Sequence, residues 1–429
     1  MAVTASEVFL HDLARRTFLK LWSAPNAYRA PGKEISDLVI VFGDDIVIFS
    51  DKACEFTIEP DAQTGWDRWR REAIDGSVRQ LAGALRRLSA DGAAIFLDAK
   101  GQAALPFPLP PRQRRRFHLV AIARPSHDPA AVPPGWSPLV CVSGSTGRPF
   151  EVEPLTVGGL PVHVFDGATI DLLLQQLDTA PDFIAYLEGR ARGFASAGPY
   201  RFKDEDLLAA SIENWASGSG LSPEVPSFNS VVAGAWTQYE GSDRAIRSGL
   251  LNKRSRTIDN LIEHFHGTFE RGEYLLGNQP EMLAHEQALR LLAAESRFAR
   301  RMIVEPLYDS LEEVDQTVPW SSAVASPRDP QLRYQWLIYP DPPGGDDPDE
   351  FARMVDAQLQ HQTLVVAGKF AADRVVSIAL PNGRGRENVV IMRVLDSSSW
   401  TDADRLEAKR LEEEGLFGEA VQTDFIHVP

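Results

Sequence analysis

Five carboxylates and two lysines lie in the stretch GKEISDLVIVFGDDIVIFSDK, residues 32–52. Asp37 lies in one short apolar run, and Asp51 and Lys52 end the next. Two or three carboxylates can hold Mg²⁺, which polarises a phosphate and lowers the pKa of bound water. A neighbouring lysine can orient that water or stabilise the negative charge that develops. These residue types suit phosphodiester hydrolysis, provided that the fold brings the side chains together.

The elements around this stretch must supply that geometry. Residues 6–22 have apolar side chains at helical spacing, and they predict a helix with Glu7 in its first turn. Residues 35–42 and 46–49 are short Val- and Ile-rich runs separated by a Gly-Asp turn, which predicts a β-hairpin. A helix over 66–88 and a strand over 117–123 follow. This order favours an α/β arrangement that ends near residue 125.

Residues 32–52, with the elements on either side, resemble the PD-(D/E)XK nuclease superfamily, and within it the nuclease-related domains of the NERD type. The resemblance implies an αβββαβ restriction-endonuclease-like core in roughly the first 125 residues. It matches Glu7 to the superfamily's helical glutamate, Asp37 to the aspartate of its PD element and Lys52 to its catalytic lysine. It implies Mg²⁺ or Mn²⁺ as cofactor, with Glu7, Asp37 and Asp51 as metal ligands and Lys52 as the residue that activates water.

The sequence departs from the family pattern at Ser50, where an Asp or Glu is expected two residues before the lysine. A serine hydroxyl is a poor Mg²⁺ ligand compared with a carboxylate. Asp51 and Lys52 are neighbours, so on a regular strand they point to opposite faces and meet only if a bulge turns one of them. Glu7, Glu34 and Asp51 are the carboxylates within reach. Asp45 is about 23 Å from Lys52 along an extended strand and is assigned to the turn.

Two hypotheses of function follow, and the sequence does not decide between them. In the first, the protein is a metal-dependent nuclease that cuts DNA or RNA in DNA processing or phage defence. In the second, it is a catalytically inactive nuclease-like fold that acts as a binding or scaffold protein in a larger complex with a protein partner. A simpler interpretation treats Asp37 and Asp51 as solvated strand ends, with Lys52 as their surface partner.

Basic residues supply a second class of candidates. A cluster directly before the strand at 117–123 could contact a nucleic-acid backbone, although a solvated loop fits equally well. His118 enters that strand and is expected to be a hydrogen-bonded core residue. A later group, Arg297, Arg300 and Arg301, is expected on the polar face of a helix. The candidate nucleic-acid contacts are Arg112, Arg114, Arg115 and Arg116.

Beyond the first 125 residues the pattern indicates three further segments. Residues 126–200 are rich in Pro and Gly and predict a mixed α/β extension, and residues 201–315 predict a helical region. Residues 330–429 predict a small α/β module of order βαββα. Long helical segments often mediate self-association, so a homo-oligomer is one expectation.

Charge and composition narrow the class of protein. The net charge is −16, which argues against a general nucleic-acid binder, but the distribution is uneven. Residues 1–150 hold 19 basic and 16 acidic residues, whereas the rest hold 25 and 44. The N-terminal third is thus the better candidate for contact with a polyanion. The chain has two cysteines, so no disulfide scaffold is expected. It has no apolar run long enough for a membrane span, and its first residues do not resemble a secretory signal. We therefore expect a cytoplasmic protein with reduced thiols.

Overall fold

The computed structural model describes residues 5–128, 130–144, 146–195, 198–217, 224–273, 279–313, 319–340, 347–382 and 390–415. The chain divides into two compact units, Met1–Arg247 and Ser248–Pro429. Both are mixed α/β, as the sequence predicted, and their sheets combine parallel and antiparallel strands. None of the described helices is both long enough and apolar enough to cross a bilayer.

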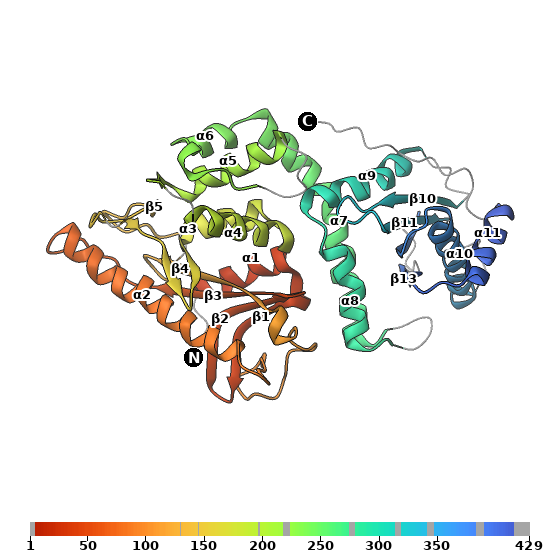
Figure 1. Cartoon of the computed structure of the whole chain (residues 1–429), viewed down its shortest axis with the longest axis horizontal. Coiled ribbons are helices and arrows are strands. Elements are labelled where there is room, and N and C mark those ends of the chain that lie inside the picture. Colours follow the sequence, from red (N-terminus) through yellow and green to blue (C-terminus); the bar gives the residue numbers. More distant parts are fainter. Residues whose placement is uncertain are drawn as a thin grey trace. The chain divides into compact units, whose positions relative to one another are not determined.

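The first unit is built on a six-stranded sheet of order β1-β2-β3-β4-β8-β7 (Figure 1). Strands β1, β2 and β3 pair antiparallel, whereas β3, β4 and β8 run parallel to one another. The Val- and Ile-rich runs predicted as a hairpin form most of β2 and β3, and the strand predicted at 117–123 forms β4. These three strands lie inside the sheet and are almost wholly buried. The strands are β1 Ser23–Ala30, β2 Lys33–Phe42, β3 Asp45–Ala53, β4 Arg116–Arg124, β7 Leu155–Val157 and β8 Leu160–Asp166.

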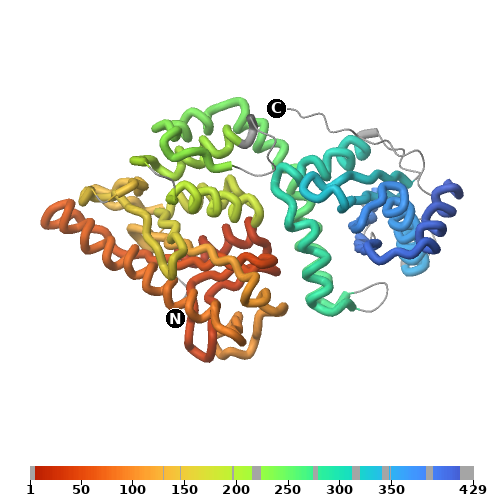
Figure 2. Tube along the Cα trace, in the orientation of Figure 1, coloured from red at the N-terminus to blue at the C-terminus, as the bar shows by residue number. Residues whose placement is uncertain are grey.

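Different helices cover the two faces of β3. Phe49 packs edge-on against Phe18 of α1, whereas Ser50 donates a hydrogen bond to Gln80 of α2. Since neighbouring side chains of a strand point to opposite faces, Lys52 shares the α2 face with Ser50. Helix α2 is one continuous helix along that face, drawn in orange in Figure 2. The helices on this sheet are α1 Ala5–Trp22, α2 Ala62–Leu88, α3 Gly167–Gln176 and α4 Ala180–Phe194.

The sheet does not end at the boundary near residue 125 that the sequence suggested. Strand β8 pairs with β4 in parallel from Leu119 to Ala123, so residues beyond 126 complete the same core. Pairing between strands about 40 residues apart leaves no local pattern, and a parallel pair needs a crossover connection. The remaining elements of this unit are η1 Arg112–Arg114, β5 Val140–Val142, β6 Glu151–Val152, β9 Arg201–Phe202, α5 Asp204–Ser217, η2 Phe228–Ser230 and α6 Ala235–Glu240.

The C-terminal module has the βαββα order that its sequence predicts, with one further strand, β10, at its edge. Its sheet has the order β10-β11-β12-β13, in which β11 and β12 are parallel. The turn predicted between β12 and β13 lies largely outside the described residues. The later elements are α7 Asp243–Arg271, α8 Met282–Ala293, α9 Arg297–Glu313, β10 Trp320–Ala325, β11 Leu332–Tyr339, α10 Pro348–Lys369, β12 Arg374–Pro381, β13 Ile391–Asp396 and α11 Asp402–Glu413.

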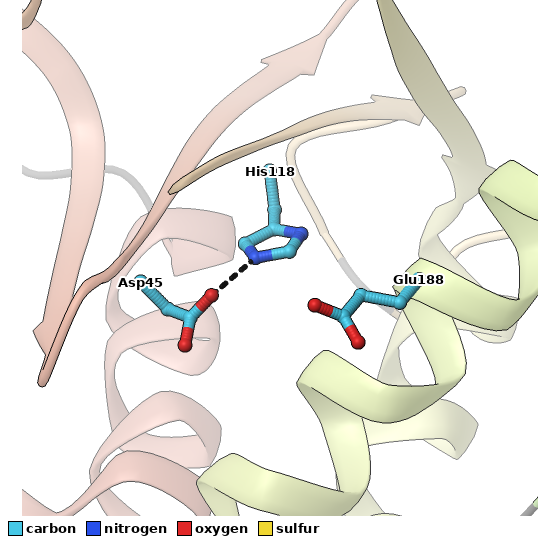
Figure 3. A group of neighbouring side chains, drawn as sticks. All are labelled: Asp45, His118 and Glu188. Atoms are coloured by element: carbon cyan, nitrogen blue, oxygen red, sulfur yellow. Dashed lines mark hydrogen bonds and ion pairs between the residues drawn. The ribbon is translucent and has the colours of Figure 1, made fainter. Parts of the chain in front are cut away.

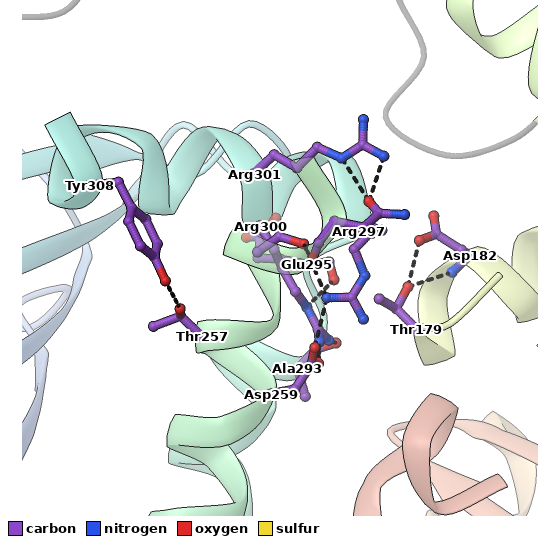
Figure 4. Close-up of polar contacts among 12 residues, drawn as sticks. Thr179, Asp182, Thr257, Asp259, Ala293, Glu295, Arg297, Arg300, Arg301 and Tyr308 are labelled. Carbon is purple, nitrogen blue, oxygen red and sulfur yellow. Dashed lines mark hydrogen bonds and ion pairs between the residues drawn. The ribbon is translucent and has the colours of Figure 1, made fainter. Parts of the chain in front are cut away.

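Arg297 and Arg300 at the start of α9 are not on a solvated face, contrary to the expectation from the sequence, and Arg301 is half-buried and donates to Asn252 of α7. Arg297 and Arg300 are buried, and both donate to the carboxylate of Asp259 in α7 (Figure 4). Arg300 also donates to the carbonyl oxygens of Ala293 and Glu295. These residues thus join α7 to α9, and the charge pattern of α9 reflects buried ion pairs.

Candidate active site

Asp37 of β2 lies buried beside the last residues of β3. Its Oδ2 accepts a 2.7 Å hydrogen bond from the backbone N–H of Asp51, and it lies 4.0 Å from Nζ of Lys52. The ring Nε2 of His11 is 3.1 Å from the carbonyl oxygen of Asp37, which ties α1 to this point of the strand. The hairpin therefore brings Asp37 and Lys52 together, on strands whose positions are fixed by the sheet.

Glu34 and Glu7 add further negative charge to this pair. Burial raises the pKa of Glu34, and the negative charge of the nearby Asp37 raises it further. Burial is the main cause that raises the pKa of both groups, and the attraction of Lys52 opposes it. The negative charge of Glu7, on α1, also raises the pKa of both groups. Asp37, Glu34, Glu7 and Lys52 form what we call the Asp37 cluster.

The residues of the Asp37 cluster fit Mg²⁺. This ion keeps several waters and is often held by one or two carboxylates together with substrate phosphates. Asp37 and Glu34 supply that number, and a bound cation would offset the repulsion between their negative charges. Across the described residues, three potential ligand atoms come within 4.8 Å of one another only at Asp45, His118 and Glu188, so Glu7 contributes charge more than a third bond.

Ser50 occupies the position where the family pattern has a carboxylate, and it points to the same face as Lys52. Its hydroxyl is fully buried and donates a 2.9 Å hydrogen bond to Oε1 of Gln80. A serine and glutamine pair thus joins β3 to α2 at this position. Glu34, a carboxylate that interacts with Asp37, lies on β2 and not on β3.

The structure does not bring the Asp51 carboxylate to this site. Strand β3 keeps a regular register with β4 from Asp45 to Ala53, so no bulge turns the side chain round. Both Asp51 oxygens accept from Nε of Arg124, at 3.1 and 3.2 Å, and Arg124 also binds Asp171 of α3. Burial raises the pKa of Asp51 to about 6, against the attraction of Arg124. Asp51 takes part in the Asp37 cluster only through its backbone N–H.

The basic cluster before β4 lies at the other end of the sheet from Lys52. In the register of β3 with β4, Arg116 is paired with Asp45, whereas Lys52 is paired with Ala123. Seven residues of strand separate the two ends, about 23 Å. Each arginine there already has partners: Arg112 with Asp91, Arg114 with Asp44, Arg115 with three backbone carbonyls, and Arg116 with Asp45 and Glu188.

A different set of arginines borders the Asp37 cluster. A groove of about 640 Å³, which we call the arginine groove, lies between α2 and the edge of the sheet. Glu34 is one of the residues that line it. Its arginines are spaced along one side of α2 at i, i+7 and i+8, with one more from β1. The spacing of these α2 arginines can be read from the sequence. Their position next to Glu34 cannot, because it depends on how α2 packs across the sheet. The groove is lined by Arg29, Glu34, Ile35, Arg79, Gln80, Gly83, Ala84, Arg86, Arg87 and Ala90.

Comparisons of the chain with protein-family models, with curated proteins and with solved structures give no match. The residues of the site and their contacts are therefore the basis for assigning a function.

The raised pKa values of Asp37 and Glu34 predict a pH dependence of stability. A carboxyl group whose pKa is raised by folding binds its proton more tightly in the folded state, so its contribution is full below about pH 4 and is lost as the pH rises through the raised pKa. Between pH 4 and pH 7, in EDTA, the free energy of unfolding is expected to fall with rising pH. We expect a smaller fall in Asp37→Asn than in the wild type, because the variant lacks one of the two carboxyl groups with a raised pKa. Urea titrations at pH 4, 5, 6 and 7 measure it, and Asp91→Asn, at an exposed site, is the control. An unchanged slope in Asp37→Asn would contradict the assignment.

Proposed function

We propose that the chain is a Mg²⁺-dependent nuclease that hydrolyses phosphodiester bonds of DNA or RNA at the Asp37 cluster. The observation that carries the proposal is the position of Glu34, which interacts electrostatically with Asp37 and also lines the arginine groove. A cation-binding carboxylate pair and a phosphate-binding surface thus share one residue. The element order α1-β1-β2-β3-α2-β4 supports a restriction-endonuclease-like core as the framework.

Each residue of the cluster has a separate task in this mechanism. Asp37 and Glu34 would hold the cation, which supplies a polarised phosphate and a bound water of lowered pKa. The ammonium group of Lys52, 4.0 Å from Asp37, is placed to orient the attacking water or to stabilise the developing charge. The arginines of the groove would bind phosphates of the nucleic-acid backbone. Ser50 and Gln80 hold β3 against α2, so that Lys52 keeps its position.

Cleavage assays with the full chain test the proposal. Supercoiled and linear duplex DNA, single-stranded DNA and RNA are incubated with Mg²⁺ or Mn²⁺, and with EDTA as the metal-free control. We expect cutting of at least one substrate that stops in EDTA and is lost in Asp37→Asn. The absence of metal-dependent cutting on all four substrates would overturn the proposal.

The arginine groove gives a binding prediction that does not require catalysis. We expect the double substitution Arg86→Gln and Arg87→Gln to weaken nucleic-acid binding and to reduce the slope of log K against log salt by about 1 to 2, because each lost phosphate contact removes about one released counterion. Both side chains are exposed on α2, so folding is not expected to change. Fluorescence anisotropy of labelled duplexes and single strands measures it, in the Asp37→Asn background to prevent cutting.

The matched control for this experiment is the double substitution Arg112→Gln and Arg114→Gln at the other end of the sheet. It removes the same charge from exposed arginines that pair with Asp91 and Asp44. We expect an unchanged salt slope. Equal weakening by both pairs would mean that net charge, and not the groove, determines binding. Weakening by the control pair alone would assign binding to the basic cluster that the sequence suggested.

The alternative function is a non-catalytic binding or scaffold protein, and one observation favours it. The Ser50 to Gln80 hydrogen bond fills the position of the motif carboxylate with groups that bind Mg²⁺ poorly. On this hypothesis the arginine groove would bind an acidic surface without cutting. Retained binding in the anisotropy experiment, together with no cleavage in any assay, would support it.

A further inference from the structure

A second cluster of ligand-type side chains lies at the other end of β3. Asp45 is the first residue of β3, His118 lies on β4 and Glu188 on α4 (Figure 3). One ligand atom from each lies within 4.8 Å of the other two. About 23 Å of strand separate Asp45 from Lys52, so this cluster is distinct from the candidate active site.

The distances suit a small divalent ion of the first transition series. Bonds from such an ion to histidine nitrogen and carboxylate oxygen are about 2.0 to 2.2 Å, which places neighbouring ligand atoms about 3 Å apart. Nε2 of His118 is already 2.8 Å from Oδ1 of Asp45. The third ligand is adjustable, because the Glu188 side chain is 37% exposed and projects from α4 toward the pair.

The sheet holds the first two ligands in place. Asp45 and His118 are both buried, and β3 and β4 are hydrogen-bonded in a regular parallel register through this region. A pair of ligands on adjacent strands of a buried sheet keeps its geometry with or without an ion. An ion would therefore need to order only the Glu188 side chain.

Arg116 now supplies the positive charge at this position. Its guanidinium binds Oδ2 of Asp45 at 2.5 Å and Oε1 of Glu188 at 3.5 Å. A buried carboxylate such as Asp45 requires a cation beside it. The Arg116 side chain is 59% exposed, so it can move into solvent when another cation takes its place. Arg116 and a metal ion would thus compete for the same two carboxylates.

We propose that Asp45, His118 and Glu188 form a binding site for a divalent transition metal of the Zn²⁺ class, with Arg116 as the competing cation. One imidazole and two carboxylates are a suitable ligand set for Zn²⁺, Co²⁺ or Mn²⁺, and their mixture of nitrogen and oxygen distinguishes the site from the all-oxygen Asp37 cluster. Bound metal would tie α4 to the sheet through Glu188. The inference stands independently of nuclease activity.

Metal titration of the full chain tests the proposal. After EDTA treatment and dialysis, Zn²⁺ binding is measured by calorimetry and Co²⁺ binding by its visible absorption. We expect His118→Gln and Glu188→Gln each to weaken binding at least about tenfold. Glu188 is partly exposed, so Glu188→Gln remains informative if His118→Gln fails to fold. His127→Gln and Glu205→Gln are the matched controls, on residues outside the cluster, and should leave the affinity unchanged.

Arg116→Gln provides a test with the opposite sign. Removal of the competing guanidinium should tighten Zn²⁺ binding severalfold and increase the rise in unfolding temperature that Zn²⁺ produces, whereas a purely structural arginine would give no such gain. Equal Zn²⁺ binding by the wild type and both ligand variants would overturn the proposal. Loss of Zn²⁺ binding in Asp37→Asn, with binding retained in Glu188→Gln, would assign the metal to the Asp37 cluster instead.

Discussion

Lys52→Ala is expected to slow metal-dependent cleavage of nucleic acid by about 100-fold or more, while nucleic-acid affinity stays within a few-fold of the wild type. The reason is that the ammonium group near Asp37 acts on the attacking water and on charge that develops only in the transition state. An interaction of that kind changes the rate of the chemical step more than it changes binding. Single-turnover cleavage at saturating protein measures the rate, and anisotropy measures the affinity.

Lys33→Ala is the control for this substitution. Lys33 is an exposed lysine at the start of β2, and the two variants have the same net charge. The Lys52 side chain is 35% exposed but lies beside the buried carboxylate of Asp37, so Lys52→Ala is expected to lower the free energy of unfolding, and a urea titration checks that the variant is folded under the assay conditions. A similar loss of cleavage rate in Lys33→Ala would mean that the effect of Lys52→Ala comes from the change in net charge and not from the position of Lys52. Cleavage by Lys52→Ala at the wild-type rate would show that the reaction does not use the cluster.

Local patterns in the sequence were enough to predict most of the elements that carry the site. The apolar runs of β2 and β3 and the stripe of α2 correspond to buried elements because their side chains contact the core directly. Strand β1 had no such signal. It contains Pro25, which a strand tolerates at the edge of a sheet, and its segment therefore resembled a loop.

The contacts within the site were harder to predict, because they join residues that are distant in sequence. Asp51 is 73 residues from Arg124, so alternation along β3 showed that Asp51 faces away from Lys52 but could not show what it binds. His118 and Asp45 are also 73 residues apart, and only the parallel register of β3 with β4 brings them together. Spacing along a strand shows which of its side chains share a face of the sheet. The order and register of the strands determine which residues of neighbouring strands lie side by side.

Arg124→Ala is expected to destabilise the first unit by about 3 to 5 kcal/mol at neutral pH, the largest effect on stability among the substitutions considered. Arg124 is 2% exposed, and it binds Asp51 through Nε and Asp171 through its two terminal nitrogens. Its removal leaves Asp51 as a buried carboxylate without its cation, and it also opens a cavity between β3 and α3. Since the two units can unfold separately, hydrogen exchange of β3 and β4 peptides in urea is the measurement.

Two comparisons separate the buried charge from the lost volume. Arg112→Ala removes an arginine from an exposed pair with Asp91, and it should cost less than about 1 kcal/mol. Adding Asp51→Asn to Arg124→Ala removes the unpaired charge but keeps the cavity, so the double variant should regain part of the lost stability. If the double variant is no more stable than Arg124→Ala, the cost comes from packing, and the Asp51 carboxylate is not the charge that Arg124 neutralises. A loss of under 1 kcal/mol in Arg124→Ala itself would mean that water or Lys52 compensates Asp51, and the separation of Asp51 from the Asp37 cluster would then have to be reconsidered.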